Sequence, residues 1–362
     1  MAKSSTGKTL PELRKQIDGI DHQILKLLGR RARTALKIGQ AKRKGSKSVL
    51  DVSREKAVFA AIRKANPGPL RDEAIEAIFR EVISACRAYQ APTSVAFLGP
   101  AGTFSHAAAV RQFGHTADFE AVATIDDVFA AVEAGRARYG VVPIENTTEG
   151  AVTPTLDALA TTSLSVVAEI LVKVDHYLMS KSGEASKIRT IVSHVQPLAQ
   201  CRKYLAERYP NVEQQAAPST ASAAILAGKR AGLAAIGSKL AAEIYGLELV
   251  ARSIQDVAGN VTRFLVIGTD PQPKPSGDDR TSLVILVRDE VGVLGRVLQP
   301  FTGNRVNLSM IESRPLAGRP WEYRFFIDIG GHVTDKRLAA ALREVDDISL
   351  STKVLGSYPV AG

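Results

Sequence analysis

The sequence predicts a multidomain protein in which an all-α segment, an α/β segment and an α+β segment follow one another. Apolar residues recur every three or four positions from Leu10 to Leu27, which is typical of an amphipathic helix. Between residues 94 and 270, short apolar runs alternate with helical patterns, which favours an α/β fold with largely parallel strands. Residues 281–362 follow the order βαββαβ, the pattern of ferredoxin-like folds.

Length and two proline-containing stretches divide the 362 residues into three parts. Such a length corresponds to two or three domains of roughly 100–200 residues. Pro92 follows the helical segment, and residues 270–280 contain three prolines and no other apolar residue, so we expect an exposed tether there. The expected domains are residues 1–91, 94–270 and 281–362.

Composition excludes several classes of protein. The contents of 45% hydrophobic and 23% charged residues are ordinary for a globular chain. No stretch reaches the ~18 consecutive apolar residues of a membrane span, and the N-terminal residues lack an apolar signal core, so we expect a cytosolic protein without membrane contact. Two cysteines and six scattered histidines give no disulfide framework or metal-binding spacing, so no metal or cofactor is expected.

The N-terminal helical segment holds all the excess positive charge. Residues 1–91 contain 20 Lys and Arg against 9 Asp and Glu, whereas the remaining residues contain 27 against 28. A first helix from about residue 10 to 43, broken at Gly45, would be ~50 Å long. A 90-residue domain cannot cover such a rod, so we expect two chains to wrap around each other. Two further helices are expected, from Asp51–Ser53 to before Asn66 and from about Arg71 to Gln90.

Two cations lie on the helix face that should be packed. After Leu27 the apolar alternation reaches Arg31, and Lys42 lies only about 20° away around a helix that turns 100° per residue. Because buried charges need partners, an anion bound within the helical bundle would explain both cations. A solvent-exposed charge run is the alternative, and it is the expectation for most other cations of this segment.

Further polar residues of this segment share helix faces. Asp51, Arg54 and Glu55 are spaced i, i+3, i+4, and Cys86 and Gln90 are four apart. Together with three cations of the first helix, they match the functional positions of the all-helical chorismate mutases, which residues 10–90 resemble. These cations are Arg14, Arg31 and Lys42.

The resemblance implies a role for most of these residues. Arg31 and the Arg14 of a partner chain would hold the carboxylates of chorismate. Lys42 and Gln90 would bond the ether oxygen, and Glu55 the ring hydroxyl. Asp51, Arg54 and Cys86, which stands where the family often has serine, would complete the substrate-binding set. Rearrangement of chorismate to prephenate needs no nucleophile, metal or proton transfer, so catalysis would come from binding a compact conformer and stabilising charge on the ether oxygen.

The central segment contains five short polar motifs beside predicted strands. The turn GPAGTFS (99–105) lies between a strand and a helix, where backbone N–H groups and hydroxyls suit an anion. Glu145 and Asn146 follow an apolar strand, the position at which α/β folds bind ligands. The motifs are GPAGTFS (99–105), PIENT (143–147), SHVQ (193–196), STAS (219–222) and TRF (262–264).

In this order the motifs resemble the prephenate dehydratase domain over its full length. The resemblance implies a two-lobed fold like that of periplasmic binding proteins, with the active site in the cleft. Thr262 would donate a proton to the departing ring hydroxyl of prephenate, while loss of a carboxylate drives aromatisation to phenylpyruvate. Val195 replaces a proline that is usual in the family. The expected substrate-binding residues are Ser105, Glu145, Asn146, Thr147, Ser193, Gln196, Thr220, Arg263 and Phe264.

The C-terminal segment resembles an ACT domain, a module that binds amino acids at a dimer interface. The stretch NLSMIESRP (307–315) matches the phenylalanine-binding signature of this enzyme family, and GVL (292–294) replaces the usual GAL. The resemblance implies feedback inhibition by L-phenylalanine, with the affinity altered by Val293. The expected effector-binding residues are Gly292, Leu294, Asn307, Leu308, Glu312, Ser313 and Arg314.

The order of the three segments predicts a cofactor-free bifunctional enzyme of phenylalanine biosynthesis, acting as a homodimer or a dimer of dimers. One alternative is a dehydratase that prefers arogenate, the amino analogue of prephenate. Another is a transcription regulator, which would also join a basic helical domain to a two-lobed effector-binding domain. A DNA-binding helix-turn-helix needs short helices around a tight turn, and the long apolar run of residues 10–43 does not fit one, so no nucleic-acid partner is expected.

Overall fold

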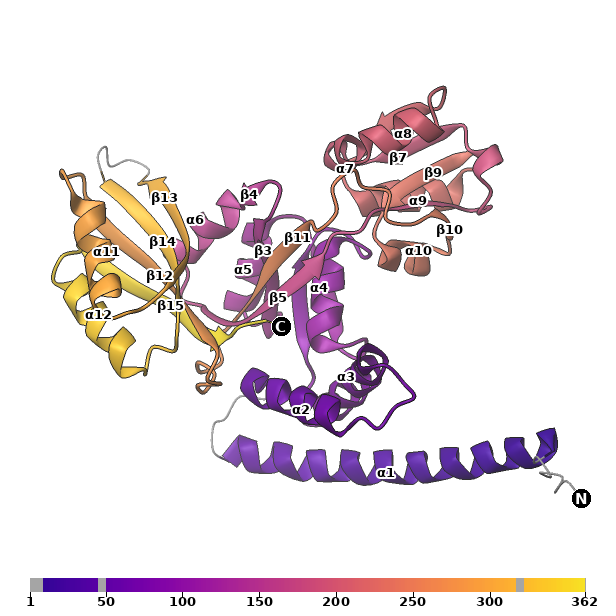
Figure 1. The fold of residues 1–362 in the computed structure, drawn as a ribbon, viewed down its shortest axis with the longest axis horizontal. Helices are drawn as coiled ribbons and strands as arrows, with labels where there is room; N and C mark the ends of the chain where they lie inside the picture. The colour runs from indigo at the N-terminus through magenta and orange to yellow at the C-terminus, as the bar shows by residue number, and fades with distance from the viewer. Residues whose placement is uncertain (1–8, 45–49, 317–321, 362) are drawn as a thin grey trace, which may run out of the picture.

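The computed structural model of the chain describes residues 9–44, 50–316 and 322–361. The first lobe, which contains β1 to β5 and β11, lies at the centre of the molecule (Figure 1). The second lobe, with β6 to β10, and the C-terminal module, with β12 to β15, lie on opposite sides of it, and the N-terminal helices lie below. Gly45, the expected break of the first helix, and Trp321, expected at the start of a strand, lie outside the described residues. Among the residues that are described, no helix is long and apolar enough to span a membrane.

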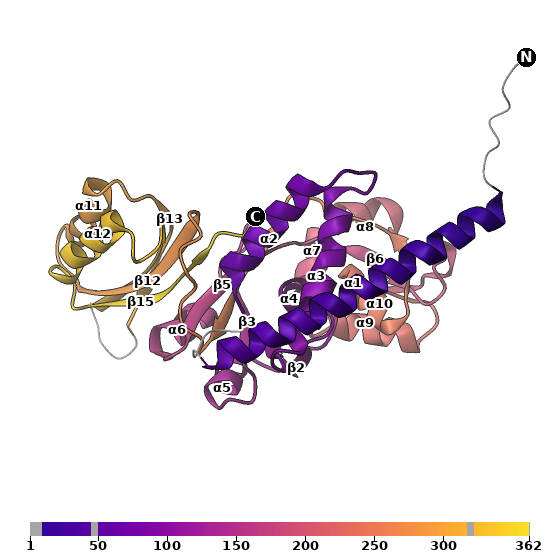
Figure 2. The ribbon, with the colours of Figure 1, turned by 90° about the horizontal axis from the view of Figure 1, so that it is seen from below.

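Three N-terminal helices are present where the sequence predicts them: α1 (Leu10–Lys44), α2 (Val52–Ala65) and α3 (Asp72–Ala88). Because α1 runs unbroken for 35 residues, its sequence does not fold as a helix-turn-helix. The C-terminal half of α1 crosses α3 (Figure 2), and its Ala35 and Gly39 are buried. A Cβ at Gly39 would lie 2.9 Å from the Gln90 Cβ, so only glycine permits this approach.

The N-terminal half of α1 exposes its apolar face. Leu10, Ile17 and Ile24 lie along this face and are 62%, 56% and 47% exposed. Polar residues such as His22 occupy the opposite side of the helix. A contiguous apolar stripe of this length marks an interaction surface.

The first lobe is a mixed sheet in the order β2-β1-β3-β11-β5, with the short β4 paired to β3. Strands β1, β2 and β3 are parallel, but β11 is antiparallel to both of its neighbours. The expectation of largely parallel strands is therefore wrong, because β11 returns from the second lobe in the opposite direction. The strands are β1 (Ser94–Leu98), β2 (Asp118–Val122), β3 (Tyr139–Asn146), β4 (Gly150–Ala151), β5 (Ser165–Lys173) and β11 (Val261–Gly268).

Helices cover both faces of this sheet. One face packs on α4 (Phe104–Phe113), and the other packs on α5 (Ile125–Glu133) and α6 (Thr153–Thr161). Along β11, Phe264 and Val266 join the α4 side, whereas Leu265 and Ile267 join the α5 and α6 side. Consecutive side chains of β11 therefore pack on opposite faces of the sheet, because side chains alternate along a strand.

The second lobe is also mixed, with the order β10-β6-β9-β7-β8. The sequence of residues 198–209 has the pattern of a single helix, but it lies in two helices, because Cys201 leaves the helical conformation at φ −112° and ψ 14°. The chain passes between the lobes twice, after β5 and before β11, which confirms the two-lobed architecture. The elements are β6 (Tyr177–Ser180), η1 (Ala185–Lys187), β7 (Thr190–Ser193), α7 (Val195–Gln200), α8 (Arg202–Arg208), β8 (Glu213–Ala216), α9 (Thr220–Lys229), β9 (Leu233–Gly237), α10 (Lys239–Tyr245) and β10 (Glu248–Ala251).

The C-terminal module has the predicted βαββαβ order, with an antiparallel sheet arranged β13-β14-β12-β15. Its two helices pack on one face of the sheet. The other face shares a core with the first lobe, where Phe326, Leu355 and Tyr358 join Leu156 and Leu265. The elements are β12 (Asp279–Arg288), α11 (Val293–Gly303), β13 (Leu308–Pro315), β14 (Glu322–Gly330), α12 (Lys336–Asp346) and β15 (Ser351–Pro359).

Residues 270–280 form the connection to this module. They are exposed over much of their length, as predicted, but both ends are fixed. Asp270 accepts hydrogen bonds from Arg138 and Tyr139, and Asp279 is buried at the start of β12. The Ser53 hydroxyl also donates to the Lys274 carbonyl at 2.6 Å. The connection is therefore exposed, as expected, and it is also anchored to the first lobe and to α2.

Candidate active sites and family relationship

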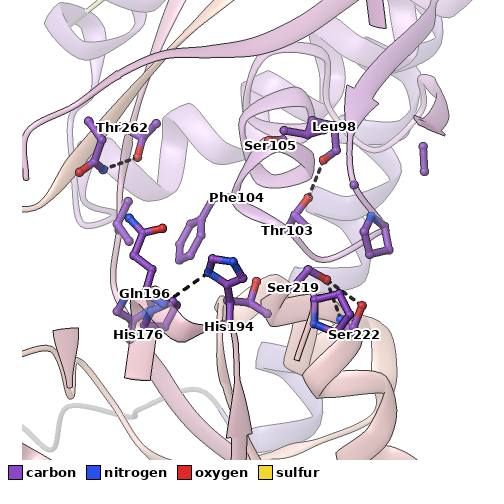
Figure 3. A pocket seen from close by; sticks show the side chains of 18 of the residues that line it. Leu98, Thr103, Phe104, Ser105, His176, His194, Gln196, Ser219, Ser222 and Thr262 are labelled. Atoms are coloured by element: carbon purple, nitrogen blue, oxygen red, sulfur yellow. Dashed lines mark hydrogen bonds between the residues drawn. The ribbon is translucent and has the colours of Figure 1, made fainter. Parts of the chain in front are cut away.

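A cleft of about 730 Å³ lies between the two lobes. The structure brings five of the predicted dehydratase residues together in its wall, from both lobes. They are Ser105, Asn146, Gln196, Thr220 and Thr262. Figure 3 shows Phe104 and His194 in the middle of the cleft, between Thr262 on one wall and Ser219 and Ser222 on the other.

Thr262 is held by a neighbouring amide. It pairs in register with Asn146 across β11 and β3, and the Asn146 Nδ2 donates to the Thr262 Oγ1 at 2.8 Å. The orientation of the amide follows from its other contacts. Its oxygen accepts from the backbone N–H of Thr148 at 2.9 Å and of Glu149 at 3.2 Å. Because backbone N–H groups can only donate, the nitrogen must face Thr262.

The threonine hydroxyl is therefore an acceptor toward Asn146. The second N–H of the Asn146 amide reaches the Asn260 Oδ1 at 2.8 Å, so both amide protons are used. The proton of the Thr262 hydroxyl is consequently available to a group in the cleft. Donation from Asn146 also stabilises negative charge on the Thr262 oxygen, which makes that proton easier to release.

The cleft contains residues that sequence reasoning missed. His176 lies at the first crossing between the lobes, with its Nε2 2.7 Å from the Gln200 Oε1. Burial lowers the pKa of His176, so this imidazole stays neutral at physiological pH. Gln200 lies one helical turn beyond Gln196, a spacing that could have revealed it. Other lining residues outside the predicted set are Phe104, His194, Ser219, Ser222 and Asn260.

The cleft has no Lys or Arg among its lining residues. Two helix N-termini open on it instead, those of α4 at Phe104 and of α9 at Thr220. The glycine-rich turn before α4 uses two positive-φ glycines, Gly99 and Gly102. Free N–H groups at helix N-termini attract carboxylates, so the wall can hold an anion without a cationic side chain.

Two predicted cleft residues do not line the cleft. The Ser193 hydroxyl is buried and donates to the Ile236 carbonyl at 2.7 Å, so it holds β7 to β9. Phe264 is buried in the core between the sheet and α4. Both side chains are therefore already used within the lobes and support the cleft from behind its wall.

Three other predicted residues lie beside the cleft or behind it. Thr147 contacts Asn260, a lining residue, through its hydroxyl at 3.3 Å. Glu145 and Arg263 point away from Thr262, and the Arg263 guanidinium meets Asp328 of the C-terminal module. Arg263 is not among the lining residues, because adjacent residues of a strand face opposite sides of the sheet.

The predicted mutase residues lie on all three N-terminal helices, but no cavity found among the described residues gathers them. Arg31 donates to the Val82 carbonyl of α3 at 3.2 Å, and Lys42 is half-buried on the same side of α1. Gln90 packs on Gly39, and its Oε1 is buried without a hydrogen-bond partner in the described structure. A buried amide oxygen without a partner is open to a hydrogen-bond donor.

The remaining mutase residues are more dispersed. Asp51 accepts from the Arg54 backbone N–H at 3.0 Å and so caps α2. Glu55 forms an ion pair with the buried Arg87. Nothing in the sequence singles out Arg87, because it is one of many charged residues in this helix. Cys86 is buried, whereas the side chains of Arg14 and Arg54 are exposed.

The predicted effector residues lie along one edge of the C-terminal module. Strand β13 is the edge strand of the sheet and carries most of them, with a bulge between Leu308 and Met310. Gly292 has φ 79° and begins α11, where any side chain would be strained. Arg314 also forms an ion pair with Asp157 of the first lobe at 3.1 Å.

Comparisons with known proteins cover all three parts of the chain. Residues 13–91 match the family "Chorismate mutase type II", residues 95–272 match "Prephenate dehydratase" and residues 281–347 match "ACT domain". A bifunctional chorismate mutase/prephenate dehydratase of Neisseria gonorrhoeae is 43% identical over 98% of this chain and 99% of its own length.

Two solved structures resemble the chain outside its N-terminal helices. A prephenate dehydratase of Arthrobacter aurescens in complex with L-Phe is 39% identical, with a TM-score of 0.69 over 74% of this chain and 90% of its own. A quorum quenching acylase, GqqA, is 30% identical, with a TM-score of 0.69 over 74% of this chain and 98% of its own. With the full-length relative, these matches show that the chain belongs to the bifunctional chorismate mutase/prephenate dehydratase family.

Proposed function

We propose that the cleft between the lobes converts prephenate to phenylpyruvate with Thr262 as the proton donor. The observation that carries this proposal is the hydrogen bond from Asn146 to Thr262, which directs the threonine proton into the cleft. The N-termini of α4 and α9 would hold the carboxylates of prephenate. Ser105 and Gln196, from opposite lobes, would orient the ring.

The reaction balances with one proton taken up. The carboxylate on the ring leaves as carbon dioxide, and its bonding electrons complete the aromatic ring. The hydroxyl at the opposite ring carbon departs and takes the Thr262 proton, so that it leaves as water. A proton from solvent then restores the threonine. In this scheme Asn146 stabilises charge on the Thr262 oxygen during the step.

The N-terminal helices would rearrange chorismate to prephenate, the substrate of the cleft. Arg31 and Lys42, which are half-buried on one side of α1, and Gln90, which packs on Gly39, support a polar site along α1 and beyond the end of α3. Arginine forks suit the two carboxylates of chorismate. Lys42 and the Gln90 amide would stabilise charge on the ether oxygen in the transition state.

Completion of the mutase site would require a second copy of the chain. The exposed apolar stripe of α1 supports a dimer in which two of these helices pack together. Arg14 lies in the N-terminal part of α1, beside that stripe, and is exposed. The partner's helix would bring its own Arg14 to the site that one chain leaves incomplete.

The C-terminal module would bind L-phenylalanine and inhibit the dehydratase. The edge strand β13, with Glu312 and Ser313, and the preceding Asn307 support such a site, because the outer side of the strand is open for pairing. The relative from Arthrobacter aurescens was solved with L-Phe bound. Gly292 and Leu294, at the start of α11, would complete the effector site.

The test of the whole proposal is phenylpyruvate formation by the purified protein from chorismate alone, with and without L-phenylalanine. We expect phenylpyruvate, and we expect phenylalanine to suppress it. Accumulation of prephenate without phenylpyruvate would contradict the role of the cleft, and activity on arogenate instead would support that substrate. Unconsumed chorismate would refute the mutase assignment.

A further inference from the structure

Arg263 lies at the junction between the first lobe and the C-terminal module. Its side chain is only 8% exposed and is surrounded by carboxylates from three strands. The guanidinium bonds Asp328 on β14, lies 3.3 Å from Glu169 on β5 and lies 3.5 Å from Glu145 on β3. Burial by itself would lower the pKa of Arg263, but the nearby Asp328, Tyr358 and Glu169 raise it above its ordinary value.

The partner of Arg263 is even more enclosed. Asp328 is 1% exposed, and Arg263 is the one cation that forms an ion pair with it in the described structure. Its other carboxylate oxygen accepts from the Ser282 hydroxyl at 2.5 Å, and Ser282 in turn contacts the Tyr358 hydroxyl. A buried charge pair of this kind is costly to break, so the two residues move together.

Asp328 is also in direct contact with the predicted effector strand. Met310 of β13 pairs opposite Asp328, and the Ser309 hydroxyl reaches the Asp328 carbonyl at 3.4 Å. On the other side, Arg263 shares a peptide bond with Thr262, whose hydroxyl lies in the cleft. One strand pairing, one ion pair and one peptide bond therefore connect the effector strand to Thr262.

We propose that the Arg263–Asp328 ion pair is the contact through which an occupied effector site repositions Thr262. Arg263 is then a positioning residue of the dehydratase and not a substrate ligand. This inference rests on the proposed inhibition by phenylalanine and names the residues that transmit it. A displacement of β13 would shift Asp328, and the rigid guanidinium fork would pull the first residues of β11 with it.

The first test is Asp328→Asn, which keeps the shape and the acceptor for Ser282 but removes the charge. We expect phenylalanine to bind within about threefold of its wild-type affinity in calorimetry. We expect the concentration that half-inhibits the dehydratase to rise about 10-fold or more, the usual scale of coupling between two sites. Inhibition unchanged from the wild type would overturn the inference.

The matched control is Asp270→Asn, which removes another ion-paired carboxylate, at the start of the connection and 3.1 Å from Arg138. Phenylalanine inhibition should stay at the wild-type level in this variant. If both variants lose inhibition equally, the loss comes from a general destabilisation of the protein and not from the Asp328 contact, which would overturn the inference. If the wild type itself neither binds phenylalanine nor is inhibited, the proposed regulation fails together with this inference.

Arg263→Lys provides a second test that keeps the positive charge and loses the fork. We expect the dehydratase kcat to fall about 10-fold with KM for prephenate within about twofold, because a positioning residue acts on Thr262 and not on substrate binding. Phenylalanine inhibition should weaken as in Asp328→Asn. A raised KM with unchanged kcat would show that Arg263 binds substrate and would overturn its assignment as a positioning residue.

Discussion

The side-chain nitrogen of Asn146 lies 2.8 Å from the hydroxyl oxygen of Thr262, and the two residues pair in register on neighbouring strands. Asn146→Ala removes the donor that stabilises charge on the threonine oxygen. We expect the dehydratase kcat to fall about 100-fold, the scale of losing one preorganised donor. Mutase activity measured on the same preparation is the internal control. A dehydratase at the wild-type rate would contradict the role of Asn146.

Lys42 and Gln90 are expected to carry the mutase chemistry. Lys42→Ala or Gln90→Ala should each lower mutase turnover at least ~100-fold, because each removes a donor to the ether oxygen. Lys37→Ala is the matched control, since Lys37 is an exposed lysine on another side of the same helix. Its turnover should stay near the wild-type value. Chorismate consumption gives the result, and near-normal turnover in the two site variants would refute the assignment.

The apolar stripe of α1 predicts a dimer that the mutase activity needs and the dehydratase activity does not. The double variant Ile17→Lys, Ile24→Lys places two charges in the packed face, where their desolvation opposes association. We expect a monomer in sedimentation experiments and at least about 10-fold lower mutase turnover, because the proposed site takes its Arg14 from the partner. His22→Lys, on the opposite side of the helix, should leave the dimer intact. A dimeric double variant would rule out this interface.

Val195 offers a stability test. It is the first residue of α7, it is 60% exposed, and the preceding His194 has the extended φ −61° and ψ 150° that a proline tolerates. Val195→Pro should therefore raise the free energy of unfolding by about 0.4–1 kcal/mol, because it restricts the unfolded chain. Denaturant unfolding measures this change. A lower stability would mean that the N–H of residue 195 has a partner.

The fold was largely predictable where periodicity is strong. The 3–4 spacing from Leu10 to Leu27 predicted α1, and the order of apolar runs predicted the βαββαβ module. The direction of β11 was not predictable, because an apolar strand has the same pattern in parallel and antiparallel pairing. The break at Cys201 was also hidden, since no glycine or proline marks it.

The site was predictable as a set of motifs but not in its orientation. Strand alternation alone indicates that Thr262 and Arg263 cannot face the same cleft, and the family signature obscured this. His176 stood outside every motif, and only the crossing between the lobes places it in the wall. Helix spacing grouped some of the mutase residues, but the full set came from the family resemblance, and the proposed geometry of their site requires a second chain.

The most direct measurement is the fate of chorismate supplied alone to the Thr262→Ala variant. Two separate sites in one chain predict that chorismate is consumed at the wild-type rate, that prephenate accumulates and that phenylpyruvate does not form. Phenylpyruvate at the wild-type rate would contradict the role of Thr262. Loss of chorismate consumption together with phenylpyruvate would contradict the separation of the two sites.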